Sequence, residues 1–231
     1  GIGRAVALAF AREGAAVAIA YLAAEEEDAQ ETVRVVHEAK RRALAVPGDI
    51  RDPQHCRALA TRTARELGGL DILVNNAAYQ MTHSSFLEMK PEEIDCVFRT
   101  NVYATFYLTQ ACVPHMKAGA SIINTASIQA FQPKPYLLHY AASKGAIVAF
   151  TQGLSQELAA QGIRVNAVAP GPVWTPLIPA SLDVEHFGRN TPLGRAAQPA
   201  EMAPIYVLLA SNEASYVTGM VYGATGGNLL I

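Results

Sequence analysis

Tyr140 and Lys144 stand four positions apart in the segment Y-A-A-S-K. On a helix, residues with this spacing share one face, so the phenol and the ammonium would project into the same space. A free tyrosine has a pKa of about 10, which is too high for acid–base chemistry near neutral pH. A cation held within roughly 4–6 Å favours the phenolate and lowers that pKa. The pair therefore predicts a tyrosine general acid or base whose pKa is lowered by a neighbouring lysine.

The Tyr140–Lys144 spacing is a weak signal by itself, because any amphipathic helix can carry such a pair on its surface. The positions of other polar residues strengthen it. Four of them stand at or just after the ends of predicted strands: Asp49, Asn75, Ser127 and Thr175. Asn101 follows an earlier helix candidate. Open α/β sheets bind their ligands beyond the carboxyl ends of the strands, so we expect these residues to form one site.

Short apolar runs alternate with longer stretches of helical spacing along the chain. We expect strands at 15–21, 43–46, 72–75, 121–124 and 164–169. We expect helices at 4–13, 25–40, 53–67, 91–116 (broken near Asn101) and 139–160. Near-continuous apolar runs are typical of parallel strands that are covered on both faces. The pattern predicts an α/β fold with a doubly wound parallel sheet flanked by helices, in a single domain over 1–231.

The segment 170–199 departs from this alternation. It has little periodicity and carries prolines at 170, 172, 176, 179, 192 and 199. Long irregular segments in compact domains are usually functional, so we expect a loop that covers the substrate. A merely tolerated insertion is the alternative.

The composition is that of a compact globular protein, since 51% of the 231 residues are hydrophobic and 16% are charged. The net charge of −2 gives no broad basic field, which argues against nucleic acid as a partner. The apolar runs are short and interrupted, and no leader sequence is recognisable. We therefore expect no membrane span and a cytoplasmic location.

The cysteines and histidines lack the spacing of a disulfide framework or a metal site. Cys56, Cys96 and Cys112 form no C-x-x-C pair, which suits a reduced protein with buried or incidental thiols. The six histidines show no H-x-x-x-H spacing. We expect no metal site.

The chain opens on Gly1-Ile2-Gly3, directly before a helix candidate and with no strand ahead of it. In dinucleotide-binding folds a glycine-rich turn joins the first strand to the first helix, and that strand lies at the centre of the sheet. Without it, both neighbouring strands would have unpaired backbone groups. We therefore expect the intact protein to have upstream residues that include a strand and an earlier glycine.

These residues together resemble the short-chain dehydrogenases/reductases, and the resemblance runs from Gly1 to about Gly227. The matching motifs are G-I-G at 1–3, D-I at 49–50, N-N-A-A at 75–78, N-V at 101–102, T-A-S at 125–127, Y-A-A-S-K at 140–144, P-G-P-V-W-T at 170–175, V-T-G at 217–219 and G-G at 226–227. The set is very specific although each motif alone is not. The chain is most similar to the bacterial branch of glucose dehydrogenases and 3-oxoacyl-carrier-protein reductases.

The resemblance implies a Rossmann-type fold and an NAD(P)-dependent oxidoreductase acting on a small carbonyl or alcohol, such as an aldehyde, ketone or sugar. Tyr140 would be the general acid in reduction and the general base in oxidation. Lys144 would lower the pKa of Tyr140 and bind the nicotinamide ribose. Ser127 would hold the substrate oxygen. Asn101 would position a water that links Lys144 to solvent.

A nicotinamide dinucleotide is the implied cofactor. Gly1, Ile2 and Gly3 would let its pyrophosphate approach the backbone at a helix N-terminus. Asp49 and Ile50 would flank the adenine. The other expected contacts are Tyr21, Asn75, Ala77, Tyr140, Lys144, Pro170, Gly171, Val173 and Thr175. The family usually has glycine where Ala78 stands, so the contact at that point is in doubt.

The choice between NAD and NADP stays open in the sequence. An acidic residue at the end of the second strand would favour NAD, and a nearby arginine would favour NADP. Tyr21 ends that strand here and Leu22 follows it, so neither rule applies.

The substrate pocket beside Tyr140 is expected to be largely apolar, with a few polar contacts. Its candidate residues are Tyr79, Gln129, Phe131, Tyr136, Trp174 and Leu177, and each could instead be ordinary core packing. By analogy with the family, helices 101–116 and 139–160 would pack between subunits of a homotetramer or dimer. Two rival functions are a cofactor-binding sensor or scaffold without turnover, and an isomerase or dehydratase of nucleotide sugars.

Overall fold

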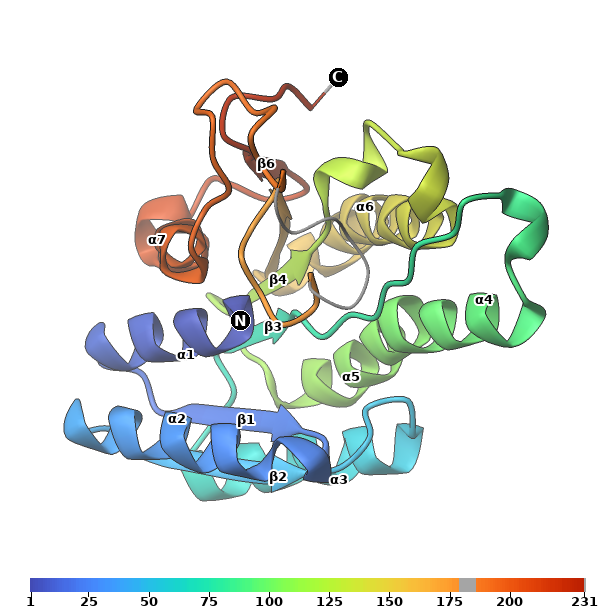
Figure 1. Ribbon diagram of the computed structural model, residues 1–231. Helices are drawn as coiled ribbons and strands as arrows, with labels where there is room; N and C mark the ends of the chain where they lie inside the picture. Colours follow the sequence, from blue (N-terminus) through green and yellow to red (C-terminus); the bar gives the residue numbers. More distant parts are fainter. Residues whose placement is uncertain (179–185, 231) are drawn as a thin grey trace.

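The computed structural model describes residues 1–178 and 186–230, and within them the strands form two parallel groups. In the first group β1 (Val17–Tyr21) pairs with β2 (Ala43–Pro47). In the second, the order is β3 (Ile72–Asn75), β4 (Ser121–Thr125), β5 (Arg164–Pro170) and β6 (Val221–Ala224). Figure 1 shows the β1–β2 pair apart from the group that contains β3 and β4.

Helices cover both faces of these strands. One apolar cluster contains side chains of α1 (Ile2–Arg12), α2 (Glu26–Glu38) and α7 (Pro199–Ala210). A second cluster contains side chains of α3 (Pro53–Leu67), α5 (Ala104–Cys112) and α6 (Leu138–Leu158). The predicted doubly wound parallel α/β fold is therefore confirmed.

Strand β4 shows why the apolar runs are continuous. Ile122 and Ile123 are both fully buried, yet they belong to different clusters, because successive side chains of a strand point to opposite faces. A strand covered by helices on both sides therefore needs apolar residues at consecutive positions. The predicted strands agree with the observed ones to within two residues at either end.

Two elements were not predicted. Helix α7 begins at Pro199, where a proline is favourable, but it has Pro204 in its interior, and an interior proline argues against a helix. Strand β6 is only four residues long, is not fully buried and contains Gly223. Both elements are fixed by tertiary packing, α7 against α1 and β6 against β5.

The predicted break near Asn101 is confirmed as a π-helical turn. It spans Arg99–Tyr103 and joins α4 (Pro91–Phe98) to α5. The backbone N–H of Ala104 donates to the carbonyl of Arg99, five residues earlier. Single π turns inside α-helices are frequent at functional sites.

Among the described residues, β1 pairs only with β2, and β3 pairs only with β4. A further strand between β1 and β3 would join the two groups into one sheet. The upstream strand expected from the sequence suits this arrangement and stays a prediction. In the described part of the chain, no helix is long and apolar enough to cross a membrane.

Two glycines near α6 provide a test of the backbone. Gly162 has φ +70°, and a Cβ there would lie 3.0 Å from the Ala118 Cβ. Gly162→Ala should therefore lower the free energy of unfolding by about 1–2 kcal/mol. Gly153, inside α6 with open space around it, is the control, and Gly153→Ala should raise this free energy by about 0.5–1 kcal/mol. Urea denaturation measures the free energy of unfolding of both variants. Equal stability of the two would contradict the strained left-handed backbone conformation of Gly162.

Candidate active site

Tyr140 and Lys144 lie in the first half of α6 and point toward the end of β4. Both are buried, and the Lys144 Nζ lies 5.6 Å from the centre of the Tyr140 ring. The Lys144 ammonium donates a hydrogen bond of 2.7 Å to the Thr125 carbonyl. The shared helix face predicted from the spacing is thus confirmed.

Ser127 follows β4 and reaches the same place. Its side chain is buried, and its hydroxyl is near enough to the Tyr140 phenol to lower the pKa of that phenol in part. Its Oγ also accepts a hydrogen bond of 3.2 Å from the Gln129 backbone N–H, which fixes its orientation. The structure therefore brings Ser127, Tyr140 and Lys144 together.

Asn101 is held in the protein interior by the backbone of Tyr79. The Asn101 Oδ1 accepts from the Tyr79 N–H at 2.7 Å, and its Nδ2 donates to the Tyr79 carbonyl at 2.9 Å. The same Nδ2 donates to Ser143 Oγ at 2.9 Å, and that hydroxyl donates to the Tyr140 carbonyl at 2.7 Å. Asn101 thus joins the π turn, the loop after β3 and α6 without lining the cavity. Its expected role in holding a water stays a prediction.

Burial has the largest effect on the pKa values of Tyr140 and Lys144. Loss of hydration raises the pKa of Tyr140 to about 12, although the Ser127 hydroxyl lowers it in part. Burial lowers the pKa of Lys144 to about 8. Desolvation of the phenolate is thus the largest influence on the Tyr140 pKa, and the lowering expected from Lys144 together with an oxidised nicotinamide stays a prediction. At neutral pH the phenol is protonated and the lysine is charged.

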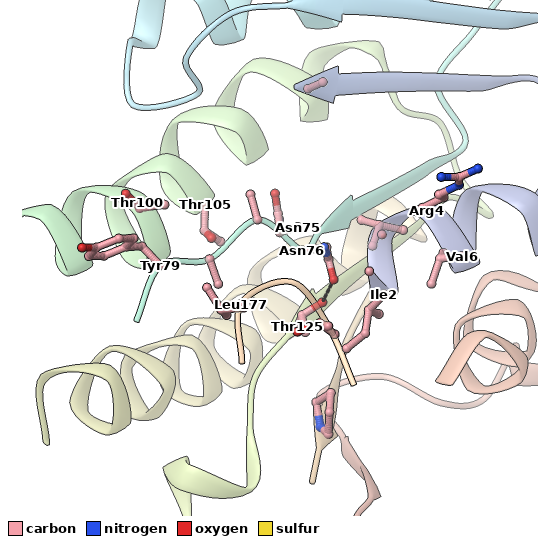
Figure 2. Close-up of a pocket in the computed structure, with 18 of the residues that line it drawn as sticks. Ile2, Arg4, Val6, Asn75, Asn76, Tyr79, Thr100, Thr105, Thr125 and Leu177 are labelled. Carbon is pink, nitrogen blue, oxygen red and sulfur yellow. Dashed lines mark hydrogen bonds between the residues drawn. The ribbon is translucent and has the colours of Figure 1, made fainter. Parts of the chain in front are cut away.

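A continuous cavity of about 1890 Å³ opens in front of these residues. All residues predicted to bind the cofactor line it: Gly1, Ile2, Gly3, Tyr21, Asp49, Ile50, Asn75, Ala77, Tyr140, Lys144, Pro170, Gly171, Val173 and Thr175. Figure 2 shows one part of its wall, with Ile2 and Arg4 on α1 opposite Tyr79 and Leu177.

Four of the six predicted substrate residues line the cavity, namely Tyr79, Gln129, Tyr136 and Leu177. The other two, Phe131 and Trp174, are not among the lining residues. Phe131 packs against an apolar cluster that contains Ala126, and the Trp174 ring meets the edge of Phe187 at 5.2 Å between centroids. Of the expected covering loop 170–199, residues 179–185 lie outside the described residues, so the loop's role stays a prediction.

The glycine turn fits the approach of a phosphate group. It forms the N-terminus of α1, which has no side-chain cap. A Cβ on Gly3 would lie 2.8 Å from Asn76 Nδ2, and a Cβ on Gly171 would lie 2.8 Å from Thr225 Cα. Only glycine leaves room at position 171, where the neighbour is backbone, whereas a side chain at position 3 would displace the Asn76 amide. The free N–H groups of a helix start suit an anion.

The sequence interpretation missed several charged residues at the far end of the cavity. Arg4 lies 3.7 Å from both Asp28 and Glu31, and Arg51 pairs with Asp49 at 2.6 Å. Arg4 directly follows the G-I-G motif and Arg51 follows D-I, so proximity to these motifs could have identified them. Charges of both signs surround this region, which leaves the choice of dinucleotide open.

Asn76 and Thr125 were also missed, although both belong to motifs singled out in the sequence. Asn76 lines the cavity beside Gly3, and Thr125 holds Lys144. Among residues 1–178 and 186–230, no three His, Cys, Asp or Glu side chains are grouped so that they could hold a metal ion.

Known proteins share this architecture. Residues 1–228 match the family model described as Enoyl-(Acyl carrier protein) reductase. The chain belongs to the short-chain dehydrogenase/reductase family, a family of oxidoreductases.

Three members of this family illustrate the similarity. Uncharacterized oxidoreductase YghA of Escherichia coli is 49% identical over 100% of this chain and 80% of its own length. NADPH-dependent aldehyde reductase 1, chloroplastic, of Arabidopsis thaliana is 48% identical over 98% of this chain and 82% of its own. The structure of 3-ketoacyl-(acyl-carrier-protein) reductase from Brucella melitensis complexed with NADH superimposes with a TM-score of 0.91 at 33% identity, over 98% of this chain and 93% of that one.

Proposed function

We propose that this family member transfers a hydride between NAD or NADP and a small carbonyl or alcohol substrate, with Tyr140 as the general acid and base. The observation that carries the proposal is the grouping of Tyr140, Ser127 and Lys144 in the wall of the cavity that also contains the glycine turn. A bound nicotinamide coenzyme would supply or accept the hydride.

The side chains of this protein would move the proton. In reduction, the neutral Tyr140 hydroxyl donates its proton to the carbonyl oxygen as that oxygen gains negative charge. The Ser127 hydroxyl donates a hydrogen bond to the same oxygen. The Lys144 ammonium stabilises the phenolate that Tyr140 becomes. In oxidation the Tyr140 phenolate takes the proton of the alcohol.

The proposed substrate is an aldehyde, a ketone or a sugar. The name of the Arabidopsis relative supports an aldehyde, and the polar amide of Gln129 beside the apolar Leu177 supports a compact, partly polar molecule. The Gln129 Oε1 accepts from the Lys134 N–H at 2.8 Å, so its amide hydrogens can serve a substrate. The alternative is a protein that binds the coenzyme without turnover. It would be favoured only if no substrate of the tested classes reacts.

Oxidation of NADH and NADPH against aldehydes, ketones and sugars tests this function, with alcohols tested in reverse. Tyr140→Phe should lower kcat at least a hundredfold, in line with the roughly 10²–10⁴-fold contribution of acid–base catalysis. The Kd for the coenzyme should stay within about threefold, because only one hydroxyl is lost. Tyr216→Phe, at a fully exposed tyrosine, is the control. Coenzyme binding without turnover by the parent protein would support the non-catalytic alternative.

The ionisation of Lys144 predicts the pH dependence. Its pKa of about 8 means that the charge beside Tyr140 is lost as the pH rises through that value. Since the phenol, with a pKa of about 12, stays protonated there, the kcat of carbonyl reduction should fall above pH 8 because of Lys144 alone. Lys144→Arg keeps its charge and should remove this fall from the profile. An unchanged fall in that variant, or none in the parent up to pH 10, would contradict the assignment.

We also propose a cytoplasmic homo-oligomer, a tetramer or a dimer, that uses the surface of α5 and α6. Phe106 on α5 is 42% exposed, and its ring lies 4.3 Å from that of Phe150 on α6. Light scattering should give a mass two or four times the 24.6 kDa chain. Phe106→Glu should shift the mass toward the monomer, because a buried carboxylate is costly, whereas Phe106→Leu should not. An unchanged mass in Phe106→Glu would show that this surface is not the subunit interface.

A further inference from the structure

Thr125 connects three parts of the molecule. It is the last residue of β4, and its carbonyl accepts the hydrogen bond of Lys144. Its Oγ1 lies 2.8 Å from the hydroxyl of Tyr206 on α7 and 3.4 Å from Asn76 Oδ1. The proposed reaction uses Lys144, but gives no role to Tyr206 or to Asn76.

The direction of these hydrogen bonds follows from the chemistry of the groups. Among the described residues, Thr125 is the only hydrogen-bond partner of the buried Tyr206 hydroxyl, so the phenol donates to the Thr125 Oγ1. The single hydroxyl hydrogen of Thr125 is then donated to the Asn76 Oδ1, which can only accept. Burial raises the pKa of Tyr206 above its ordinary value, which keeps the phenol protonated and able to donate. The chain of donors runs from Tyr206 through Thr125 to Asn76.

This direction fixes the orientation of the Asn76 amide. With Oδ1 turned to Thr125, the Nδ2 group faces Gly3, where an added Cβ would lie only 2.8 Å from it. Figure 2 shows Asn76 joined by its hydrogen bond to Thr125, with Ile2 of the glycine turn beside them. Among the described residues, no hydrogen bond occupies the hydrogens of this amide, so they are available to a ligand at the turn.

The hydroxyl group of Tyr206 is not needed to fill the space that this side chain occupies. Tyr206 is fully buried in the apolar cluster between α1 and α7, and Thr125 is its hydrogen-bond partner there. Burying a hydroxyl costs free energy unless it is hydrogen-bonded, and a phenylalanine would fill nearly the same space without that cost.

We propose that Tyr206 is a positioning residue that acts through Thr125 and holds Asn76 as a hydrogen-bond donor to the coenzyme at the glycine turn. The inference rests on the proposed function only in requiring that a nicotinamide dinucleotide binds. It goes beyond that function in assigning a specific task to α7, on the far side of the strand from Tyr140.

Fluorescence titration with NADH and NADPH tests the proposal through the Kd, without turnover. Tyr206→Phe should raise the Kd about fivefold, the equivalent of one typical hydrogen bond of about 1 kcal/mol. Asn76→Ala should raise it by at least as much. In the double variant, Tyr206→Phe should add nothing further, because its effect passes through Asn76. The substrate KM should not change in Tyr206→Phe.

Several outcomes would overturn this assignment. Multiplying effects in the double variant would mean that Tyr206 acts independently of Asn76, and an unchanged Kd in Tyr206→Phe would remove its role. Tyr222→Phe is the matched control, since Tyr222 contacts the same cluster and no hydrogen bond of its hydroxyl occurs among the described residues. Should Asn76→Ala fail to fold, Thr125→Val replaces it in the same cycle. If these variants raise the coenzyme Kd as predicted but the parent protein shows no turnover, only the proposed catalytic function is rejected.

Discussion

The site depends on one buried charge, the Lys144 ammonium on the Thr125 carbonyl. An ammonium inside a protein is costly unless polar atoms surround it, and the fold supplies such an atom where β4 ends. The position of α6 against β4 is therefore set by electrostatics as well as by apolar packing. Because Tyr140 lies one helical turn away on the same face, its hydroxyl is placed by the same contact.

A second group of buried polar side chains holds the strands and helices behind this site. Asn75 donates to Asn124 at 2.8 Å and to Thr109 at 3.1 Å, and Asn124 donates to Thr151 at 2.9 Å. These bonds join β3, β4, α5 and α6 in the interior. Apolar strands alone could slide past one another at little cost, whereas an amide network is satisfied in a single register. This network therefore keeps the carboxyl ends of β3 and β4, where the expected ligand contacts lie, aligned with each other.

The sequence predicts those parts of the site that depend on local periodicity. The helical spacing places Tyr140 beside Lys144, and the ends of apolar strands place Asp49, Asn75 and Ser127 at one cavity. It does not predict the direction of the Tyr140 pKa shift, because the degree of burial is set by tertiary packing. The positions of Phe131 and Trp174 also depend on loop geometry that no periodicity encodes. Asn101 was found by resemblance, but its bonds to Tyr79 cross a loop whose path only the structure gives.

The π turn at Arg99–Tyr103 has a consequence for how this segment can change in length. A helix with such a turn contains one residue more than a regular helix of the same span, and removing any residue of the turn would restore a regular ladder. That deletion would leave α4 and α5 in their present relative phase, because the extra residue is absorbed within the turn, but it would shift the residues of the turn itself by one position. Asn101 could then no longer face Tyr79 and Ser143 while α4 and α5 kept their present contacts. The number of residues in this turn is therefore constrained, as well as the identity of Asn101.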